Sequence, residues 1–537
     1  MDPNNKKLPI YLPLAFSVVL VLGIIIGIRL NANHSSTKNF FSAQQTNFNK
    51  INELINFIEQ EYVDDIKKEQ LVDKAINSLL GDLDPHSYYI SAEELAAANE
   101  PLEGNFEGIG IEFNMQKDTL IVISTIEGGP SELAGIIAGD RLIKVNGEII
   151  AGKKLDTDVV VKKLKGAKDT KVIVTVLRKN KKQLNFTLIR GKIPIKSIDA
   201  GYMVNNTTGY IKLSRFAKNT HQEFIETASL LKSKGMSSLI LDLRGNGGGY
   251  LDAAISLADE FLEPKKLIVY TEGKARPKSS HYSTNAGSFE NLNLSILVDE
   301  GSASASEILA GAIQDNDKGL IIGRRTFGKG LVQEQVIWPD NSAIRLTIAR
   351  YYTPSGRSIQ KPYKTEGEDY FNETYKRYEN GELMEKDSIH FSDSLKYYTA
   401  KGRAVYGGGG IMPDIFVPID TSENSVFLME ISQSGLINQF AFDYVDKNRE
   451  ILKKYRSFEA FNKSFQITES IFEDFINYSE SVGLNSEFID LKKSSKAIKT
   501  RLKAHIAKQL WKNEGFYQVI QVLDKTFQRA LYTKKAK

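Results

Sequence analysis

Apolar and polar positions divide the chain into segments of different character. Residues 8–28 carry no charged side chain, and a helix of this length, at about 1.5 Å per residue, can cross a hydrocarbon core of about 30 Å. The run ends in Arg29-Leu30-Asn31, which favours an uncleaved anchor over a signal peptide or a buried core helix. We therefore expect a transmembrane helix within residues 1–30, followed by a polar linker over 31–46.

A helical N-terminal region follows the linker. Apolar side chains recur at helical spacing, first at Ile51, Leu54, Ile55 and Ile58, and this pattern predicts helices within residues 47–102. The turn Gly81-Asp82-Leu83-Asp84-Pro85-His86-Ser87 interrupts them. We interpret its histidine as a turn or packing residue and not as a metal ligand.

Residues 103–192 are β-rich. Short strand-like runs at 120–124, 141–145 and 171–177 alternate with glycine-rich turns, which predicts a compact module. Together with Gly128-Gly129-Pro130-Ser131, the segment Gly108-Ile109-Gly110-Ile111 resembles a PDZ domain. The resemblance implies that the amides of Gly108, Ile109, Gly110 and Ile111 bind a peptide's C-terminal carboxylate; the alternative is a tight hairpin entry without a ligand.

Strand-like and helical patterns then alternate over residues 193–420, which is typical of an α/β layer fold. Strands are predicted at 210–213, 238–243 and 294–298, and helices at 221–233, at 250–261 and after Ser304. The chemistry is expected in this part of the chain.

Composition excludes several classes of function. In 537 residues, Lys and Arg number 70 against 66 for Asp and Glu. The resulting net charge of +4 is too small to indicate nucleic acid as a partner. The chain has no cysteine, which excludes disulfides, thiolate nucleophiles and metal sites with cysteine ligands.

Two loops after predicted strands are candidates for catalysis. Residues Arg244-Gly245-Asn246-Gly247-Gly248-Gly249 lack the Lys-Ser/Thr ending of a P-loop and the spacing of a dinucleotide fingerprint. Their amides, at a helix N-terminus, can stabilise an oxyanion, or the loop can be only a tight turn. The second loop, Ser302-Ala303-Ser304-Ala305-Ser306-Glu307, starts a helix, so Ser304 is either a nucleophile or only an N-cap in a capping box.

A lysine is the candidate base for such a serine. No Gly-x-Ser-x-Gly elbow is present, and the six histidines lie in no recognisable catalytic motif. Lys329 lies among apolar and glycine neighbours in Thr326-Phe327-Gly328-Lys329-Gly330 and precedes Gln333 by four residues. Burial could lower its pKa enough for it to act as a base; the alternative is a surface-loop lysine.

These motifs together resemble the C-terminal processing peptidases, or tail-specific proteases, of serine peptidase family S41. The similarity covers about residues 51–418 and includes Leu83 to Ser87, the PDZ module and Tyr352-Thr353-Pro354-Ser355-Gly356-Arg357. It implies a crotonase-like α/β protease core that needs no metal or other cofactor. The implied roles are Ser304 as nucleophile, Lys329 as general base, Gln333 as its orienting partner, and the amides of Ala305 and Gly248 as oxyanion hole.

The resemblance implies a membrane-anchored serine endopeptidase that processes the C-terminal tails of envelope proteins. Its body would face the periplasm or exterior from the inner membrane, with a cytoplasmic N-terminus and a single membrane pass. One alternative is a non-catalytic PDZ scaffold that binds protein tails, and another is a serine hydrolase acting on non-protein acyl substrates.

Two segments depart from the family pattern. Residues 365–401 are polar and Tyr-rich and are interpreted as an insertion, more as a solvated surface excursion than as a lid. Residues 421–537 are helical and basic, with Ile498, Leu502, Ile506 and Leu510 every four residues. We expect this helical C-terminal extension to pack on the protease, or to mediate a homodimer or adaptor contact through the helical ends.

Overall fold

The computed structural model describes residues 16–23, 49–116, 118–178, 182–363, 368–390 and 392–533. Of the predicted membrane anchor, residues 16–23 are helical and the remainder lies outside the described residues. Among the residues described, no helix has the length and apolar character needed to cross a membrane. The chain divides into two compact units, Met1–Leu79 and Leu80–Lys537, which are described separately below.

The helical pattern after the linker is confirmed. In the first unit, α2 (Lys50–Glu61) begins where the Asn49 side chain accepts a hydrogen bond from the Asn52 amide, as an N-cap residue does. α3 (Lys68–Gly81) follows. In the second unit, α4 (Ala92–Glu103) comes after a short strand, β1 (Tyr88–Ile90), which the helical pattern did not predict.

The β-rich module folds as predicted. Its sheet has the strand order β3-β4-β5-β7-β8, with β6 paired to β5, so that β3 is an edge strand. Valines at 122, 172, 174 and 176 fill its core. A ribbon of β2 and β9 carries the chain into and out of the module. The bounds are β2 Asn105–Gly108, β3 Ile111–Gln116, β4 Thr119–Thr125, α5 Pro130–Leu133, β5 Arg141–Val145, β6 Glu148–Ile149, α6 Thr157–Leu164, β7 Lys171–Arg178, β8 Lys182–Ile189 and β9 Gly191–Pro194.

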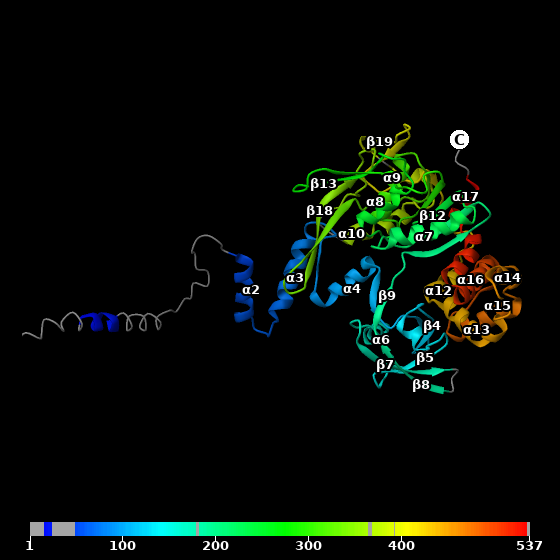
Figure 1. Cartoon of the computed structure of the whole chain (residues 1–537), viewed down its shortest axis with the longest axis horizontal. Helices are drawn as coiled ribbons and strands as arrows, with labels where there is room; N and C mark the ends of the chain where they lie inside the picture. The colour runs from blue at the N-terminus through cyan, green and yellow to red at the C-terminus, as the bar shows by residue number, and fades with distance from the viewer. Residues whose placement is uncertain are drawn as a thin grey trace, which may run out of the picture. The chain divides into compact units, whose positions relative to one another are not determined.

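The predicted α/β core is built on a six-stranded sheet of order β10-β11-β12-β15-β16-β21. All neighbours in it pair in parallel except β10 and β11. Alternate residues point to opposite faces of a strand, and helices α7, α8 and α9 cover one of these faces (Figure 1). The bounds are β10 Ile198–Met203, β11 Thr208–Leu213, α7 Thr220–Ser233, β12 Ser238–Asp242, α8 Leu251–Asp259, β15 Asn293–Val298, α9 Ala305–Asp315, β16 Leu320–Gly323 and β21 Ile415–Phe416.

A second, antiparallel sheet contains β1 and four strands of the protease core. In it β18 pairs with β1, β13 and β17, and β14 pairs with β13, all antiparallel. Through β1, the turn that ends at Ser87 is fixed against the protease core. The bounds are β13 Leu267–Glu272, β14 Ser279–Tyr282, β17 Leu331–Ile337 and β18 Ala343–Tyr352.

The predicted insertion is packed on the core at one end, over residues 370–383, while residues 392–398 are exposed or only partly buried. Helices α10 (Glu368–Phe371) and α11 (Glu373–Glu379) pack on the core. Tyr370 and Leu383 are buried, as is Arg377, which donates from Nη1 to the Thr326 carbonyl at 2.8 Å. The polar composition did not reveal this packed end, because its charged side chains, such as Arg377 with Glu373, are paired within the protein.

The C-terminal extension is helical, as predicted, and it contacts the protease core. Its own apolar cluster is built mainly by α12, α13 and α16, drawn in orange to red in Figure 1. The predicted amphipathic helix is confirmed, with Ile498, Leu502 and Ile506 buried. The bounds are α12 Val426–Gln433, α13 Leu436–Leu452, α14 Phe458–Ser464, α15 Glu469–Ser481, α16 Phe488–Ile520, η4 Gln521–Leu523 and α17 Lys525–Tyr532.

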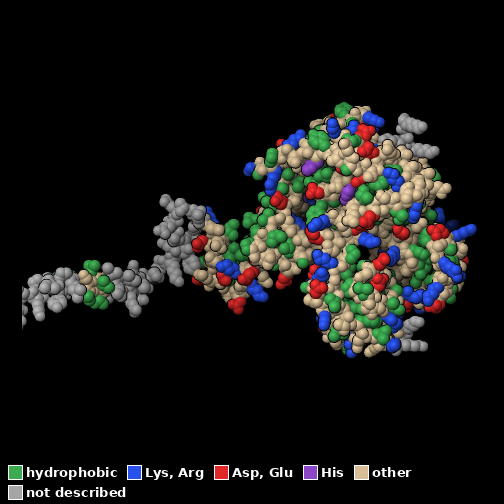
Figure 2. All heavy atoms as spheres, viewed as in Figure 1, with side chains coloured by type: hydrophobic (Ala, Val, Ile, Leu, Met, Phe, Trp, Pro, Cys, Tyr) green, Lys and Arg blue, Asp and Glu red, His purple; other side chains and the backbone are tan. Residues whose placement is uncertain are grey.

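The last helix covers the second face of the core sheet. Phe527 and Ala530 of α17 pack with Tyr210, Ile240 and Leu297 of the central strands. Their strand neighbours point to the face under α7 to α9. A parallel sheet needs cover on both faces, so the extension completes the protease core. On the molecular surface shown in Figure 2, basic and acidic side chains are interspersed.

Candidate active site

The two predicted catalytic loops lie side by side at the carboxyl ends of β12 and β15. These strands are parallel neighbours, so their carboxyl ends share one edge of the sheet, where α/β proteins place ligands. Three hydrogen bonds join the loops: Ser302 Oγ donates to the Leu243 carbonyl at 2.9 Å, Ser306 Oγ to the Asn246 carbonyl at 2.8 Å, and the Ala303 amide to the same Asn246 carbonyl at 3.0 Å.

Gly248 touches the predicted nucleophile. It has a φ of +101°, and a Cβ at this position would lie 2.8 Å from Ser304 Cβ and 2.9 Å from the Ala305 nitrogen. Only glycine fits so close an approach. The Gly248 amide, predicted to bind an oxyanion, donates to Asn246 Oδ1 at 2.9 Å. The predicted residue therefore lies at the expected place with its donor already engaged.

Ser304 has a rare backbone conformation, with φ 55° and ψ −113° at the N-cap of α9. Such values are sparsely populated by residues other than glycine, cost on the order of 1–3 kcal/mol, and persist where the surroundings enforce them. The Ser304 amide donates to Glu307 Oε2 at 2.8 Å. The glutamate of the capping box therefore holds the strained residue from one side.

Glu307 also binds the segment that carries the predicted base. Its Oε2 accepts the Lys329 amide at 2.9 Å, and its Oε1 accepts the Gly328 amide at 2.7 Å and Thr326 Oγ1 at 2.5 Å. The Tyr351 hydroxyl contacts the carbonyl oxygens of both Ser304 and Lys329. Two buried side chains thus fix the backbone of Ser304 relative to that of Lys329.

Burial raises the pKa of the Glu307 carboxyl to about 7, although the four hydrogen bonds it accepts act in the opposite direction. The same carboxyl is fully buried. Its ionised form accepts hydrogen bonds only, which suits four donors, while the protonated form places an O–H among them. The charge state of Glu307 therefore changes near neutral pH.

The Lys329 side chain contacts Gln333, the partner that the family resemblance implies. Lys329 Nζ donates to Gln333 Oε1 at 2.9 Å. The amide nitrogen of Gln333 in turn donates to the His86 carbonyl. Burial lowers the pKa of the Lys329 amine, an effect that Arg345 reinforces and that Asp84 and Glu307 oppose. Burial and the Arg345 charge therefore favour a neutral amine. Within the described chain, no hydrogen bond joins the Ser304 hydroxyl to this amine, whose recorded acceptor is Gln333.

The turn at residues 83–87 supports this arrangement. Asp84 Oδ1 accepts the amides of His86 and Ser87 at 2.8 and 2.9 Å. The His86 Nε2 atom lies 3.0 Å from the Tyr370 hydroxyl. Burial, with a contribution from the Lys329 charge, lowers the pKa of His86 to about 4. His86 is thus a neutral packing residue, as interpreted, whose backbone carbonyl orients Gln333.

The predicted carboxylate-binding loop lies in the β-rich module. Gly110 has a φ of +72°, and a Cβ there would lie 3.0 Å from Ile193 Cδ1. The carbonyls of Ile109 and Gly110 accept the amides of Ser131 and Ile126 at 3.0 Å each. Edge strand β3 begins directly after the loop. A loop followed by an open strand edge is the arrangement that peptide addition to a sheet uses.

Sequence reasoning missed several supporting residues. Glu307 was considered only as a helix cap, although its spacing from Ser304 contained the signal. Tyr351 and Tyr370 lie in no motif that marks them, and Asn246 was considered only as part of the glycine loop. Their roles depend on contacts over long sequence separations.

Comparison with known proteins agrees with this geometry. Residues 207–367 match peptidase family S41, residues 121–178 match a PDZ domain, and residues 28–94 match the N-terminal domain of the activating protease CtpB. Residues 427–512 match a family of unknown function.

Curated relatives point to the same class. The carboxy-terminal-processing protease of Bartonella bacilliformis is 37% identical over 309 residues, which are 56% of this chain and 70% of the relative. CtpB of Bacillus subtilis is 34% identical, over 58% of this chain and 65% of the relative. A photosystem II D1 C-terminal processing protease is 26% identical with a TM-score of 0.35, covering 68% of this chain and 86% of that one. The chain therefore belongs to the carboxy-terminal processing proteases of peptidase family S41 and is a serine-type peptidase with a PDZ domain.

Proposed function

We propose that the chain cleaves protein tails with a Ser304–Lys329 dyad. The observation that carries this proposal is the double link, through Glu307 and Tyr351, between the backbones of the two residues. A lysine acts as a general base when its amine is neutral, which burial favours. Rotation of the Ser304 hydroxyl toward the amine would complete the pair.

The reaction follows from this pair. Lys329 takes the Ser304 proton as the oxygen attacks the peptide carbonyl, and then gives that proton to the leaving amine. Water, deprotonated by the same lysine, releases the acyl group. The Ala305 amide, first in helix α9, would donate to the oxyanion. Gly248 can supply a second donor once its amide leaves Asn246 Oδ1.

The PDZ module is proposed to present the substrate. A protein tail would place its carboxylate on the amides of Gly108 to Ile111 and add a strand to the open edge of β3. The main-chain bonds of such a strand are independent of side chains, so specificity would come from apolar pockets beside it.

The proposal includes a single-pass anchor at residues 8–28 in the inner membrane, with the catalytic body outside the cytoplasm. The support is the uncharged run of the sequence.

Replacement of either dyad residue should abolish cleavage. Ser304→Ala and Lys329→Ala are expected to lower kcat by on the order of 10³-fold or more. The assay is cleavage of a protein with an apolar C-terminal tail, with circular dichroism to confirm the fold. Lys274→Ala, at an exposed lysine of the same domain, is the control.

The substrate tail gives a second comparison. A tail with an amidated C-terminus should be cleaved more slowly than one with a free carboxylate. Retained turnover in either dyad variant contradicts the assignment, and tail binding without turnover in the unmodified chain favours the scaffold alternative.

The charge on Glu307 should shape the pH profile. Because its pKa lies at about 7, we expect kcat to fall as pH decreases through this value, when the carboxyl gains a proton. Glu307→Gln should lower kcat about 10- to 100-fold with a small change in KM, and should remove that inflection. Steady-state kinetics from pH 5.5 to 9 measure both effects.

The Glu307 carboxyl also affects folding stability, and this pH dependence is opposite in sign to that of kcat. A folded pKa above the ordinary value means that folding favours the protonated form, so its contribution to stability decreases as pH rises from about 4.5 to about 7.

The kinetic prediction for Glu307→Gln has a matched control. Glu334→Gln, at an exposed strand position, should keep the wild-type kinetic profile. An unchanged inflection in Glu307→Gln would assign it to another group.

Membrane anchoring has a direct test. The complete chain should remain with the membrane fraction after alkaline carbonate extraction, and a chain that starts at residue 47 should be released. A protease added outside the cytoplasm should digest the body of the anchored chain. Release of the complete chain by carbonate would contradict the anchor.

The predicted association through the helical ends also remains a proposal. Light scattering of the complete chain, corrected for detergent, should give the mass of two copies of 60.1 kDa. A mass of one copy removes the dimer and leaves an adaptor as the partner of these regions.

A further inference from the structure

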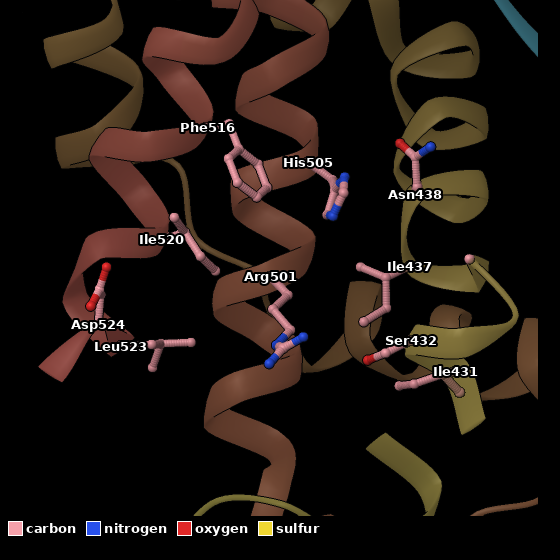
Figure 3. A pocket seen from close by; sticks show the side chains of 11 residues that line it. Ile431, Ser432, Ile437, Asn438, Arg501, His505, Phe516, Ile520, Leu523 and Asp524 are labelled. Carbon is pink, nitrogen blue, oxygen red and sulfur yellow. The ribbon is translucent and has the colours of Figure 1, made fainter. Parts of the chain in front are cut away.

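The helical extension contains a cavity that the proposed proteolysis does not use. Its volume is about 370 Å³, the space of roughly a dozen water molecules at ~30 Å³ each. The walls come from α12 and α13 on one side and from the C-terminal half of α16 with η4 on the other (Figure 3). This region lies largely within residues 427–512, which match a family of unknown function.

Two polar atoms in the cavity are buried without a partner. They are Arg501 Nε and His505 Nδ1, one helical turn apart on α16. Figure 3 shows both side chains in the space between the two walls. Buried polar atoms of this kind are rare because each loses its hydration without compensation. A ligand that accepts hydrogen bonds would satisfy Arg501 Nε, and would satisfy His505 Nδ1 in the tautomer that carries its proton on that nitrogen.

The positive charge of Arg501 is also uncompensated. Among the residues described, no carboxylate forms a salt bridge with Arg501; the closest influence is Glu423, which is paired with Lys496 at 3.6 Å. Asp524 lines the cavity, but both its oxygens are held by Arg244, at 2.9 and 2.6 Å. Arg501 is partly buried, and a partly desolvated cation without a carboxylate partner makes an anion the complementary ligand.

The anion should carry one charge. Burial, together with Lys508 and Arg501, lowers the pKa of His505 to about 4, so this side chain is neutral at pH 7 and Arg501 is the sole cation that lines the cavity. Asp524 in the wall disfavours a second negative charge on the ligand. A carboxylate fits this balance better than a phosphate dianion.

The rest of the ligand should be aliphatic. Most of the remaining wall is apolar, from Ile431, Ile437, Phe516, Ile520 and Leu523, and the polar side chains of Ser432 and Asn438 complete it. The wall backbone is helical, so its free hydrogen-bonding groups are confined to the end of α12 and the start of α13. A peptide would find few partners for its amides there, while an alkyl chain has none to satisfy.

We propose that this cavity binds a medium-chain aliphatic carboxylic acid, with the carboxylate on Arg501 and His505 and the chain between α13 and η4. About a dozen non-hydrogen atoms fill the volume, which corresponds to decanoate. The site is separate from the dyad and from the PDZ loop, so the proposal does not rest on the proposed proteolysis.

Calorimetric titration of sodium decanoate into the complete Ser304→Ala chain tests the site. We expect saturable binding of one decanoate, and at least tenfold weaker binding of decan-1-ol and of decylammonium. Arg501→Met should weaken decanoate binding at least tenfold, since it removes the charged donor. Arg501→Lys should retain part of the affinity. Lys493→Met, which removes an exposed charge from the same helix, should bind as the parent chain does.

Each other outcome overturns the proposal. Equal affinity in Arg501→Met and the parent places the acid elsewhere, for example on the PDZ loop. Preference for an acetylated apolar tripeptide with a free carboxylate replaces the aliphatic acid with a peptide end. No saturable heat up to 1 mM decanoate removes the site. If Arg501→Met fails to fold in a thermal melt, the comparison of acid, alcohol and amine on the parent chain decides.

Discussion

The active site depends on one buried carboxylate. Glu307 accepts hydrogen bonds from the backbone of the nucleophile and from the backbone of the base, which lie on different segments of the chain. Without it, Ser304 would have to keep φ 55° and ψ −113° with fewer bonds to enforce them, and sparsely populated backbone conformations relax when their surroundings allow it. A carboxylate suits this role because it accepts several donors and donates to none.

Strand topology explains why the other groups converge on the same point. Parallel neighbours β12 and β15 place their loops at one edge of the core sheet, which brings Gly248 against Ser304. Lys329 precedes β17, which belongs to the second sheet together with β1. The turn before β1 supplies the His86 carbonyl that orients Gln333. The site is therefore held at the junction of two sheets and not by any one loop.

Much of this was predictable from the sequence, and the failures share a cause. The hydrophobic periodicity predicted the strands and helices of the core, and sequence motifs identified Ser304, Lys329 and Gln333 as candidates. The bonds of Tyr370 to His86 and of Tyr351 to Ser304 and Lys329 link residues that are distant in sequence, where local patterns carry no information. The packed end of the insertion was missed for a similar reason, because its sequence gives no sign of partners such as Arg325, which binds Glu382.

The C-terminal extension is part of the catalytic architecture through Arg244. This residue starts the glycine loop and is bound by Asp242 of the core and by Asp524 of the extension. Arg244 and Lys212 hold the pKa of the buried Asp242 carboxyl below its usual range against the effect of burial. Asp524 also caps α17, which covers the second face of the core sheet. Gly248 is four residues from Arg244 and touches Ser304. A shift of α17 would therefore move Arg244 through Asp524, and with it the glycine loop that contains the predicted oxyanion donor Gly248.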